Sequence, residues 1–320
     1  PFNPSQGTYI YLLPVLVFVL VTALLLMDSK QVLRLNSLLV VLKFSALAVF
    51  ILVGLFHLNP DNWANFAPFG FGQIYGGKTG IIAGASLMFF GFLGFESISM
   101  TVDEIKEPQK NVPRGIVLAL IIVASLYAVV SLVLTGVVHY TKLNVDDAVA
   151  YALRYIGVPW AANYVSVVAI MTLITVCISM AYALSRMVYS LARDGFLPQT
   201  FQKVSKTHKV PHHATLLTGI LSAISAGVFS LANMASLVNI ATLAYLVLLA
   251  IALIILRKDK GLPQKGEFKV PFVPVLPILS IIVCLSFMSQ YSWQTWLAFG
   301  ISVLVGSAIY AFYGYKHSKY

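Results

Sequence analysis

The decisive stretch of this sequence, residues 84–115, reads GASLMFFGFLGFESISMTVDEIKEPQKNVPRG. It begins as an apolar helix, in which Gly91 and Gly94 stand three residues apart and the carboxylate of Glu96 follows. Each glycine lowers helix propensity by about 1 kcal/mol relative to alanine. In a bilayer every backbone N–H and C=O needs a partner, so an unwound helix is tolerated only where protein, water or a ligand supplies one. The pattern indicates either a broken helix that binds a small molecule or a helix-packing surface, because small residues also let helices approach closely.

The composition of the whole chain is that of a membrane protein. Of the 320 residues, 59% are hydrophobic and 10% are charged, whereas soluble domains carry about 25% charged residues. Runs of about 20 apolar residues, which suffice to cross a bilayer, recur along the chain. We predict an all-α polytopic membrane protein, with a single transmembrane domain over residues 1–320 and nine spans. The predicted spans cover residues 9–27, 36–57, 80–102, 115–138, 158–191, 213–232, 236–256, 272–289 and 293–314.

The basic residues predict the orientation, because loops rich in Lys and Arg stay in the cytoplasm. When alternate loops are assigned to the two sides, 17 of the 21 basic residues fall on one side, and Lys78, Lys142 and Arg154 fall on the other. This pattern predicts an external amino terminus, a cytoplasmic carboxyl terminus and an external loop at residues 140–157. The net charge of +10 follows from this topology, so the lipid bilayer is the expected partner and nucleic acid is not.

Lys43 and Glu96 are the formally charged residues that we predict to lie well inside the spans. Lys43 lies about 12 Å below the cytoplasmic edge at 1.5 Å per residue, in a hydrocarbon layer roughly 30 Å thick. An ionisable residue at such a depth indicates a functional site. The alternative for Lys43 is an anchor whose ammonium group snorkels toward the interface, and for Glu96 it is a protonated, hydrogen-bonded structural acid. Asn239 and Thr242 are predicted to make polar contacts between helices.

Three motifs resemble the amino acid–polyamine–organocation superfamily of permeases. The segment FFGFLGFESISMTVDEIKEPQKNVPRGI (89–116) looks like the sixth helix of that family with its exit loop. SRMVYSLARDGFLPQTFQKVSKTHKVP (185–211) resembles the exit from the eighth helix, and LVNIATLAYLVLLAIALIILR (237–257) resembles the tenth. The matches occur in the correct order and, with the spans between them, cover nearly the whole chain. The resemblance implies that the nine spans are helices 4–12 of a LeuT-like inverted-repeat transporter.

The resemblance also implies how the chain is divided. Residues 1–57 would end the first repeat as family helices 4 and 5, residues 80–256 would form the second repeat as helices 6–10, and residues 272–314 would be the peripheral helices 11 and 12. The first three helices of the family have no counterpart in these 320 residues. We therefore expect either that a longer protein supplies them or that the chain is truncated.

For the binding site, the resemblance implies that substrate is held at the broken helix by Phe90, Gly91, Phe92, Leu93 and Gly94. Phe90 would be an aromatic gate above the substrate, and the carbonyls of Phe90 and Leu93 would accept hydrogen bonds from its ammonium group. Lys43 matches a fifth-helix lysine of proton-dependent members, and Glu96 matches an acidic residue with a proposed role in sensing protons. The resemblance thus implies proton coupling through Lys43 and Glu96.

The function that follows is secondary active transport of an amino acid, by proton-coupled symport or exchange, in the cell membrane. An amino acid substrate, protons and lipid are the expected partners. No catalytic residue, metal or other cofactor is predicted, and no enzyme is expected, because neither HExxH nor GxSxG occurs in a span. The alternative is a non-transporting membrane scaffold or sensor derived from such a permease, which the absent helices keep open.

Overall fold

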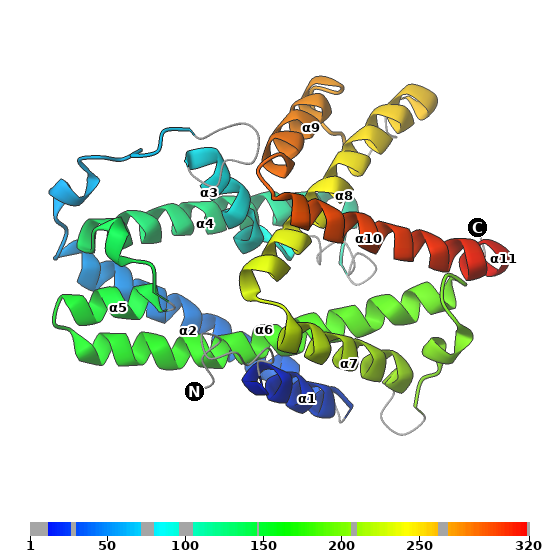
Figure 1. Ribbon diagram of the computed structural model, residues 1–320, viewed down its shortest axis with the longest axis horizontal. Helices are drawn as coiled ribbons and strands as arrows, with labels where there is room; N and C mark the ends of the chain where they lie inside the picture. Colours follow the sequence, from blue (N-terminus) through cyan, green and yellow to red (C-terminus); the bar gives the residue numbers. More distant parts are fainter. Residues whose placement is uncertain are drawn as a thin grey trace. The chain divides into compact units, whose positions relative to one another are not determined.

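The computed structural model describes residues 12–26, 30–71, 80–95, 105–145, 147–205, 210–261 and 268–318. Most of these residues are helical and none of them forms a strand (Figure 1). The prediction of an all-α protein is therefore confirmed for the described part of the chain.

The helices occur along the chain in the following order. The α-helices are α1 (Leu12–Leu26), α2 (Lys30–Leu55), α3 (Ile81–Met88), α4 (Pro108–Val137), α5 (Ala148–Tyr155), α6 (Pro159–Arg193), α7 (His212–Val228), α8 (Leu231–Lys260), α9 (Val275–Met288), α10 (Trp293–Ile309) and α11 (Tyr315–His317). Single 3-10 turns lie at η2 (Pro60–Trp63), η3 (Phe89–Phe92), η5 (Tyr140–Lys142) and η6 (Gln199–Gln202), and the π-helical turn η7 covers Tyr310–Gly314.

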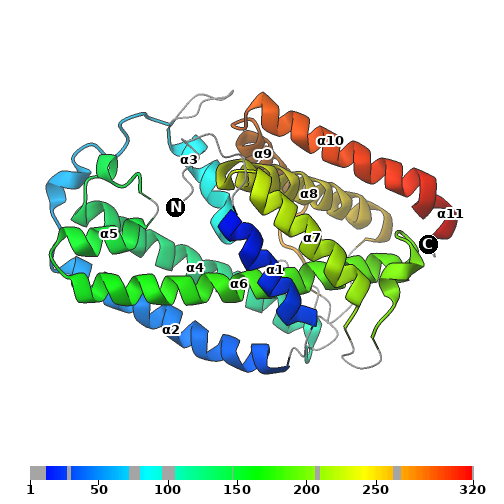
Figure 2. The ribbon, with the colours of Figure 1, turned by 60° about the horizontal axis from the view of Figure 1, so that its bottom comes forward.

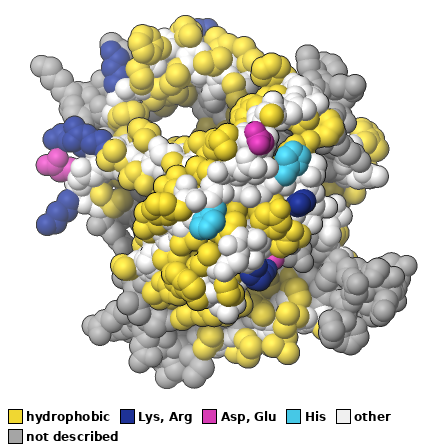
Figure 3. All heavy atoms as spheres, turned by 90° about the vertical axis from the view of Figure 1, so that its left-hand side faces the viewer, with side chains coloured by type: hydrophobic (Ala, Val, Ile, Leu, Met, Phe, Trp, Pro, Cys, Tyr) yellow, Lys and Arg dark blue, Asp and Glu magenta, His cyan; other side chains and the backbone are white. Residues whose placement is uncertain are grey.

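Four helical stretches of the described chain are long and apolar enough to cross a membrane. They are Pro108–Val137, Pro159–Arg193, Leu231–Asp259 and Trp293–His317. Shorter apolar helices lie at Leu12–Leu26, Leu39–Leu55, Ile81–Phe92 and Val275–Met288. Hydrophobic side chains also spread over the face shown in Figure 3, where charged side chains are few. Such helices are stable where lipid covers their apolar surface, so the chain is a multi-pass membrane protein.

The described residues divide into two units. The first consists of the described residues within Pro1–Ala64, Ala128–Ser230 and Leu304–Tyr320, and the second of those within Asn65–Tyr127 and Leu231–Val303. This division does not test the repeat boundaries implied by the permease resemblance, which stay a prediction.

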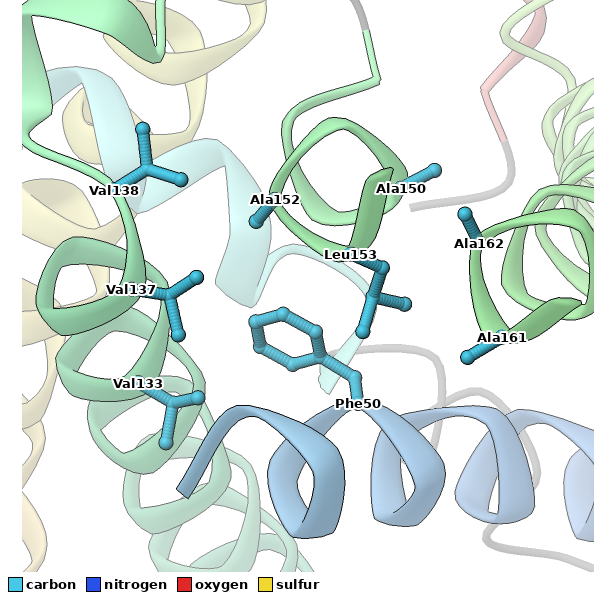
Figure 4. Close-up of a cluster of buried hydrophobic side chains, with 9 residues drawn as sticks. All are labelled: Phe50, Val133, Val137, Val138, Ala150, Ala152, Leu153, Ala161 and Ala162. Atoms are coloured by element: carbon cyan, nitrogen blue, oxygen red, sulfur yellow. The ribbon is translucent and has the colours of Figure 1, made fainter. Parts of the chain in front are cut away.

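The first unit has a core around Phe50 of α2. The side chains of Phe50 and Leu153 are fully buried, and Figure 4 shows the Phe50 ring lying between the valines of α4 and Leu153 of α5. Ala161 and Ala162 bring the start of α6 to the same cluster. Burying one such large side chain stabilises a fold by about 1.5–3 kcal/mol, so this cluster fixes the ends of α2, α4 and α6 together.

Helix α5 lies inside residues 140–157, which we predicted only as an external loop. Its side chains Ala150, Ala152 and Leu153 are buried against that core. An isolated helix of this length is unstable in water, so packing, rather than local propensity, produces α5.

Helix α1 packs against α6 and α7 in the same unit (Figure 2). Val21 and Leu25 lie against Ile178 of α6. On the α7 side, a Cβ added to Gly219 would collide with the side chain of Thr22. The small residue therefore lets α1 and α7 approach closely.

The core of the second unit joins α8 to α9. Ile240 and Leu243 of α8 pack with Cys284 and Met288 of α9, and Phe89, which follows α3, packs against this cluster. The cluster thereby holds the carboxyl-terminal end of α3, where the sequence predicts a break.

Candidate functional site

The helix that begins at Ile81 is interrupted. Its α-helical part ends at Met88, the 3-10 turn η3 covers Phe89–Phe92, and Leu93 has an extended backbone with φ −62° and ψ 146°. Gly94 then has a φ of 108°, in a region of conformational space that glycine enters without steric cost. The predicted loss of regular helix in this stretch is confirmed, while the ligand roles of its residues stay a prediction.

Tyr127 of α4 holds the middle of the break. Its hydroxyl donates a hydrogen bond to the carbonyl of Gly91 at 2.7 Å, and its ring meets that of Phe92 edge-on, with centroids 5.3 Å apart. A Cβ added to Gly91 would lie 3.4 Å from Tyr127 Cε2, which is ordinary contact. Gly91 thus lies at a packed position beside Tyr127, whereas Gly94 supplies an unusual backbone conformation, so helix packing and helix interruption belong to different glycines.

Phe90 presents both its ring and its carbonyl. The side chain is 44% exposed, so its ring is accessible to a ligand. The carbonyl accepts a hydrogen bond from the N–H of Leu93 at 3.3 Å. A carbonyl oxygen has two lone pairs, so this weak bond leaves capacity for a second donor.

Just before the break, two side chains donate to consecutive carbonyls of α3. Asn239 Nδ2 of α8 lies 3.3 Å from the carbonyl oxygen of Ser86 and 3.2 Å from that of Leu87. The hydroxyl of Tyr291, between α9 and α10, donates to the same Ser86 carbonyl at 2.8 Å. The Ser86 hydroxyl in turn donates to the carbonyl of Phe287 at 3.0 Å. The prediction that Asn239 makes a polar contact between helices is confirmed.

Sequence reasoning did not find Tyr127 or Tyr291. The signal that the sequence offers for Tyr127 is a single hydroxyl-bearing ring inside the apolar run LALIIVASLYAVVSLVL (118–134). A buried or partly buried tyrosine hydroxyl usually finds a hydrogen-bond partner, but the sequence does not identify which backbone group that partner is.

Lys43 belongs to the first unit and is half-buried on α2. Within the described part of the chain, its ammonium group has no hydrogen-bonding or ion-pair partner. Ser45 donates to the Leu42 carbonyl at 2.8 Å and shares a 2.7 Å hydrogen bond with the hydroxyl of Tyr164 in α6. Residues two apart do not share a helix face, so Lys43 lies on a different side of α2 from this contact.

Glu96, the other predicted proton-coupling residue, lies outside the described residues. Thr242, predicted as a second polar contact of the helix that carries Asn239, has no such contact within the described part. In that same part, no group of three or more His, Cys, Asp and Glu side chains is arranged to hold a metal ion.

Sequence comparison with known proteins shows the family of this chain. Residues 2–309 match the sequence profile of the family described as amino acid permease. The chain is 43% identical to the methylthioribose transporter of Bacillus subtilis (strain 168) over 315 residues, which cover 98% of this chain and 67% of that protein. It is 37% identical to the branched-chain amino acid permease of the same organism, over 98% of this chain and 66% of the permease. It is also 32% identical to human cationic amino acid transporter 4, over 69% of this chain and 35% of that protein.

The chain therefore spans about two thirds of the length of the two bacterial relatives. All three relatives bear the names of transporters or permeases, so the prediction that the chain is not an enzyme is confirmed. The match to the family profile covers nearly all of the chain, and the resemblance deduced from its three motifs is confirmed as well. This chain belongs to the amino acid permease family.

Proposed function

We propose that the chain acts as a secondary active transporter that carries an amino acid across the cell membrane by alternating access. The observation that carries this proposal is the interrupted backbone at Leu93 and Gly94 in a chain of a permease family. Broken helices at the membrane midplane are the places where transporters of known architecture bind solutes. The nine spans, their correspondence to family helices 4–12 and the cytoplasmic carboxyl terminus belong to the same proposal.

The chemistry of the break suits an amino acid. Its unwound carbonyls accept hydrogen bonds from an ammonium group, and the accessible Phe90 ring offers a face that attracts a cation. The Gly91 carbonyl accepts a 2.7 Å bond from Tyr127 and the Phe90 carbonyl a longer, 3.3 Å bond from Leu93, so in this state the Phe90 carbonyl is the better acceptor for substrate. Binding there stabilises whichever state keeps the break accessible to the ligand.

Lys43 and Glu96 are the proposed proton-coupling residues. An unpaired lysine inside an apolar helix is stable as a cation only if it reaches water, lipid headgroups or a carboxylate. Its protonation therefore favours the conformation that offers such a partner, and the substrate favours the conformation that binds it. Coupling arises because proton and substrate each bind the two states with different affinity.

A second candidate substrate is methylthioribose, because the relative at 43% identity is named as its transporter. This sugar carries hydroxyl donors and a thioether instead of an ammonium group. The hydroxyls suit the same backbone carbonyls, and a thioether contacts aromatic rings favourably. The two substrates therefore differ in charge and not in the kind of backbone acceptor that they use.

Uptake into proteoliposomes tests the proposal. The panel contains radiolabelled branched-chain amino acids, cationic amino acids and methylthioribose, each with and without an imposed pH gradient. Saturable uptake of one panel member that a protonophore reduces is the expected result, and protein-free liposomes are the control. If no member enters the liposomes although each is tested above and below neutral pH, the scaffold or sensor alternative is favoured.

A further inference from the structure

The end of α3 is tied to two other segments of the second unit. Ser86 is 1% exposed and Asn239 is 0% exposed. Asn239 Nδ2 donates to the Ser86 and Leu87 carbonyls, and the Tyr291 hydroxyl donates to the Ser86 carbonyl as well. Asn239 from α8 and Tyr291 from the α9–α10 turn thus hold two consecutive peptide groups of α3.

These carbonyls lie where the helix changes its hydrogen-bonding pattern. In a regular α-helix each carbonyl bonds the N–H four residues on, but the following residues Phe89–Phe92 form a 3-10 turn, whose bonds span three residues. Carbonyls at such a transition point partly away from the helix axis and need donors from elsewhere. The Leu87 carbonyl also accepts from the N–H of Phe89. Asn239 supplies a further donor to the Ser86 and Leu87 carbonyls, and Tyr291 supplies one to the Ser86 carbonyl.

The Asn239 amide makes its hydrogen bonds to the end of α3 although one of its own atoms stays unpaired. In the described part of the chain its Oδ1 is buried without a hydrogen-bond partner, although buried polar atoms are seldom left unpaired. A leucine of similar size would avoid that unpaired oxygen, but it would also remove both donors to α3. The amide therefore stabilises one particular position of the α3 end instead of simply filling the core.

The expected topology agrees with this contact. The amino-terminal ends of α3 and α8 and the turn between α9 and α10 all fall on the external side of the proposed topology. Ser86 lies about 8 Å and Asn239 about 12 Å from the starts of their helices at 1.5 Å per residue. The residues that meet are therefore expected at comparable depth in the outer half of the membrane.

We propose that Asn239 and Tyr291 are positioning residues for substrate binding: by bonding the Ser86 and Leu87 carbonyls they hold Phe89–Gly94 in the conformation that receives substrate. This inference rests on the proposed transport function. Neither side chain needs to touch the substrate. Loss of either one frees the α3 end to adopt other conformations, so only a fraction of the molecules is competent to bind and the apparent affinity falls by that fraction.

Tyr291→Phe is the sharpest test, because it removes one hydroxyl and leaves the ring in the core. We expect this variant to raise the KM for uptake about fivefold, the factor that corresponds to the net loss of one hydrogen bond, with kcat changed less than twofold. Asn239→Leu removes two donors, and we expect it to raise KM by roughly tenfold or more. The matched control is Tyr245→Phe, on α8, whose side chain is 49% exposed.

The double variant separates positioning from general destabilisation. Both side chains donate to the Ser86 carbonyl, so we expect the effects of Tyr291→Phe and Asn239→Leu on KM to combine to less than their product.

Asn239→Gln retains the amide, and we expect its KM to lie nearer the parent value than that of Asn239→Leu. Size-exclusion chromatography checks that both single variants are folded. If they are folded and their KM values are unchanged, the inference is overturned, but the proposal of transport is not.

A measurement without substrate keeps the inference apart from the transport proposal. Hydrogen–deuterium exchange of peptides that cover residues 84–95 is expected to be at least threefold faster in Tyr291→Phe and Asn239→Leu than in the parent and in Tyr245→Phe. Should the parent transport nothing, faster exchange would still support the positioning role, and unchanged exchange would contradict it. An increase in exchange along the whole chain would show global destabilisation and would also contradict it.

Discussion

At the break, Gly94 is needed for its backbone conformation, whereas Gly91 is not. The backbone of Gly94 has a φ of 108°, and a residue with a Cβ is strained there by about 1–3 kcal/mol. Gly91 has no such backbone conformation, and a Cβ on it would make ordinary contact with Tyr127 at 3.4 Å. Identical substitutions at these two positions therefore separate conformation from packing.

We expect Gly94→Ala to lower the thermal stability of the purified protein and its uptake activity, with a loss of about 1–3 kcal/mol in the free energy of unfolding. Gly91→Ala is the control, and we expect a loss below about 1 kcal/mol because alanine also raises helix propensity. Thermal unfolding followed by fluorescence-detected chromatography measures both. Equal destabilisation by the two substitutions would argue that the positive φ of Gly94 is not what requires glycine at that position.

A substitution of Lys43 tests the proposed coupling of uptake to protons. Replacement by the uncharged methionine should abolish the dependence of uptake on an imposed pH gradient while leaving exchange of internal for external substrate. The control is Lys316→Met in α11, where the lysine is exposed near the carboxyl terminus. Uphill uptake that Lys43→Met leaves undiminished would favour the alternative of a snorkelling anchor.

At the scale of single helices, the sequence predicted helical segments well and their tertiary support poorly. The spans at 115–138 and 158–191 correspond to α4 and α6, because long apolar runs have few alternatives to helix in lipid. The interruption near Gly94 could likewise be predicted from two glycines in an apolar run. Helix α5 could not, since its eight residues are stable only against the cluster around Phe50.

The side chains that bond to the interrupted helix could not be predicted from the sequence either, because these contacts also depend on tertiary packing. Tyr127 lies 36 positions from Gly91 along the chain, and Asn239 lies 153 positions from Ser86. A periodic pattern indicates which face of a helix is apolar, but it does not indicate which distant hydroxyl or amide meets a freed carbonyl. The family resemblance of a local motif therefore implied the ligand residues Phe90–Gly94, whereas the groups that hold this segment are visible only in the fold.

The contact between α1 and α7 provides an element-scale prediction. We expect Gly219→Ala to destabilise the protein by about 1–3 kcal/mol, because the new methyl group would collide with Thr22 and overpack the interface. The control is Gly306→Ala on α10, where a Cβ would have no neighbour within 4 Å. There the higher helix propensity of alanine should leave stability unchanged or raised. A drop of equal size at both positions would contradict the close approach of α1 and α7.

At the scale of the whole molecule, the distribution of charge predicts which loops face the cytoplasm. Four exposed positions sample the proposed topology: Asp61 and Lys142 in loops assigned to the outside, and Lys203 and Lys258 in regions assigned to the inside. The bilayer excludes a charged maleimide, so a cysteine reacts in intact cells only if its loop is external. The orientation and the parity of the spans between these positions can therefore be measured together.

We expect Asp61→Cys and Lys142→Cys to react with the maleimide in intact cells, and Lys203→Cys and Lys258→Cys to react only after the membrane is permeabilised. The parent chain supplies the background, because its Cys177 and Cys284 lie in the apolar helices α6 and α9. The change of side between positions 142 and 203 requires an odd number of crossings, which α6 alone provides. Positions 203 and 258 share a side if α7 and α8 both cross, as the nine-span topology requires, or if neither does. Helix α7 has only 17 residues, which is at the lower limit for a membrane span, so the 203 and 258 pair is the most demanding test. Reaction of Lys258→Cys in intact cells, with Lys203→Cys still protected, would mean that only one of these two helices crosses, and the nine-span topology would be wrong.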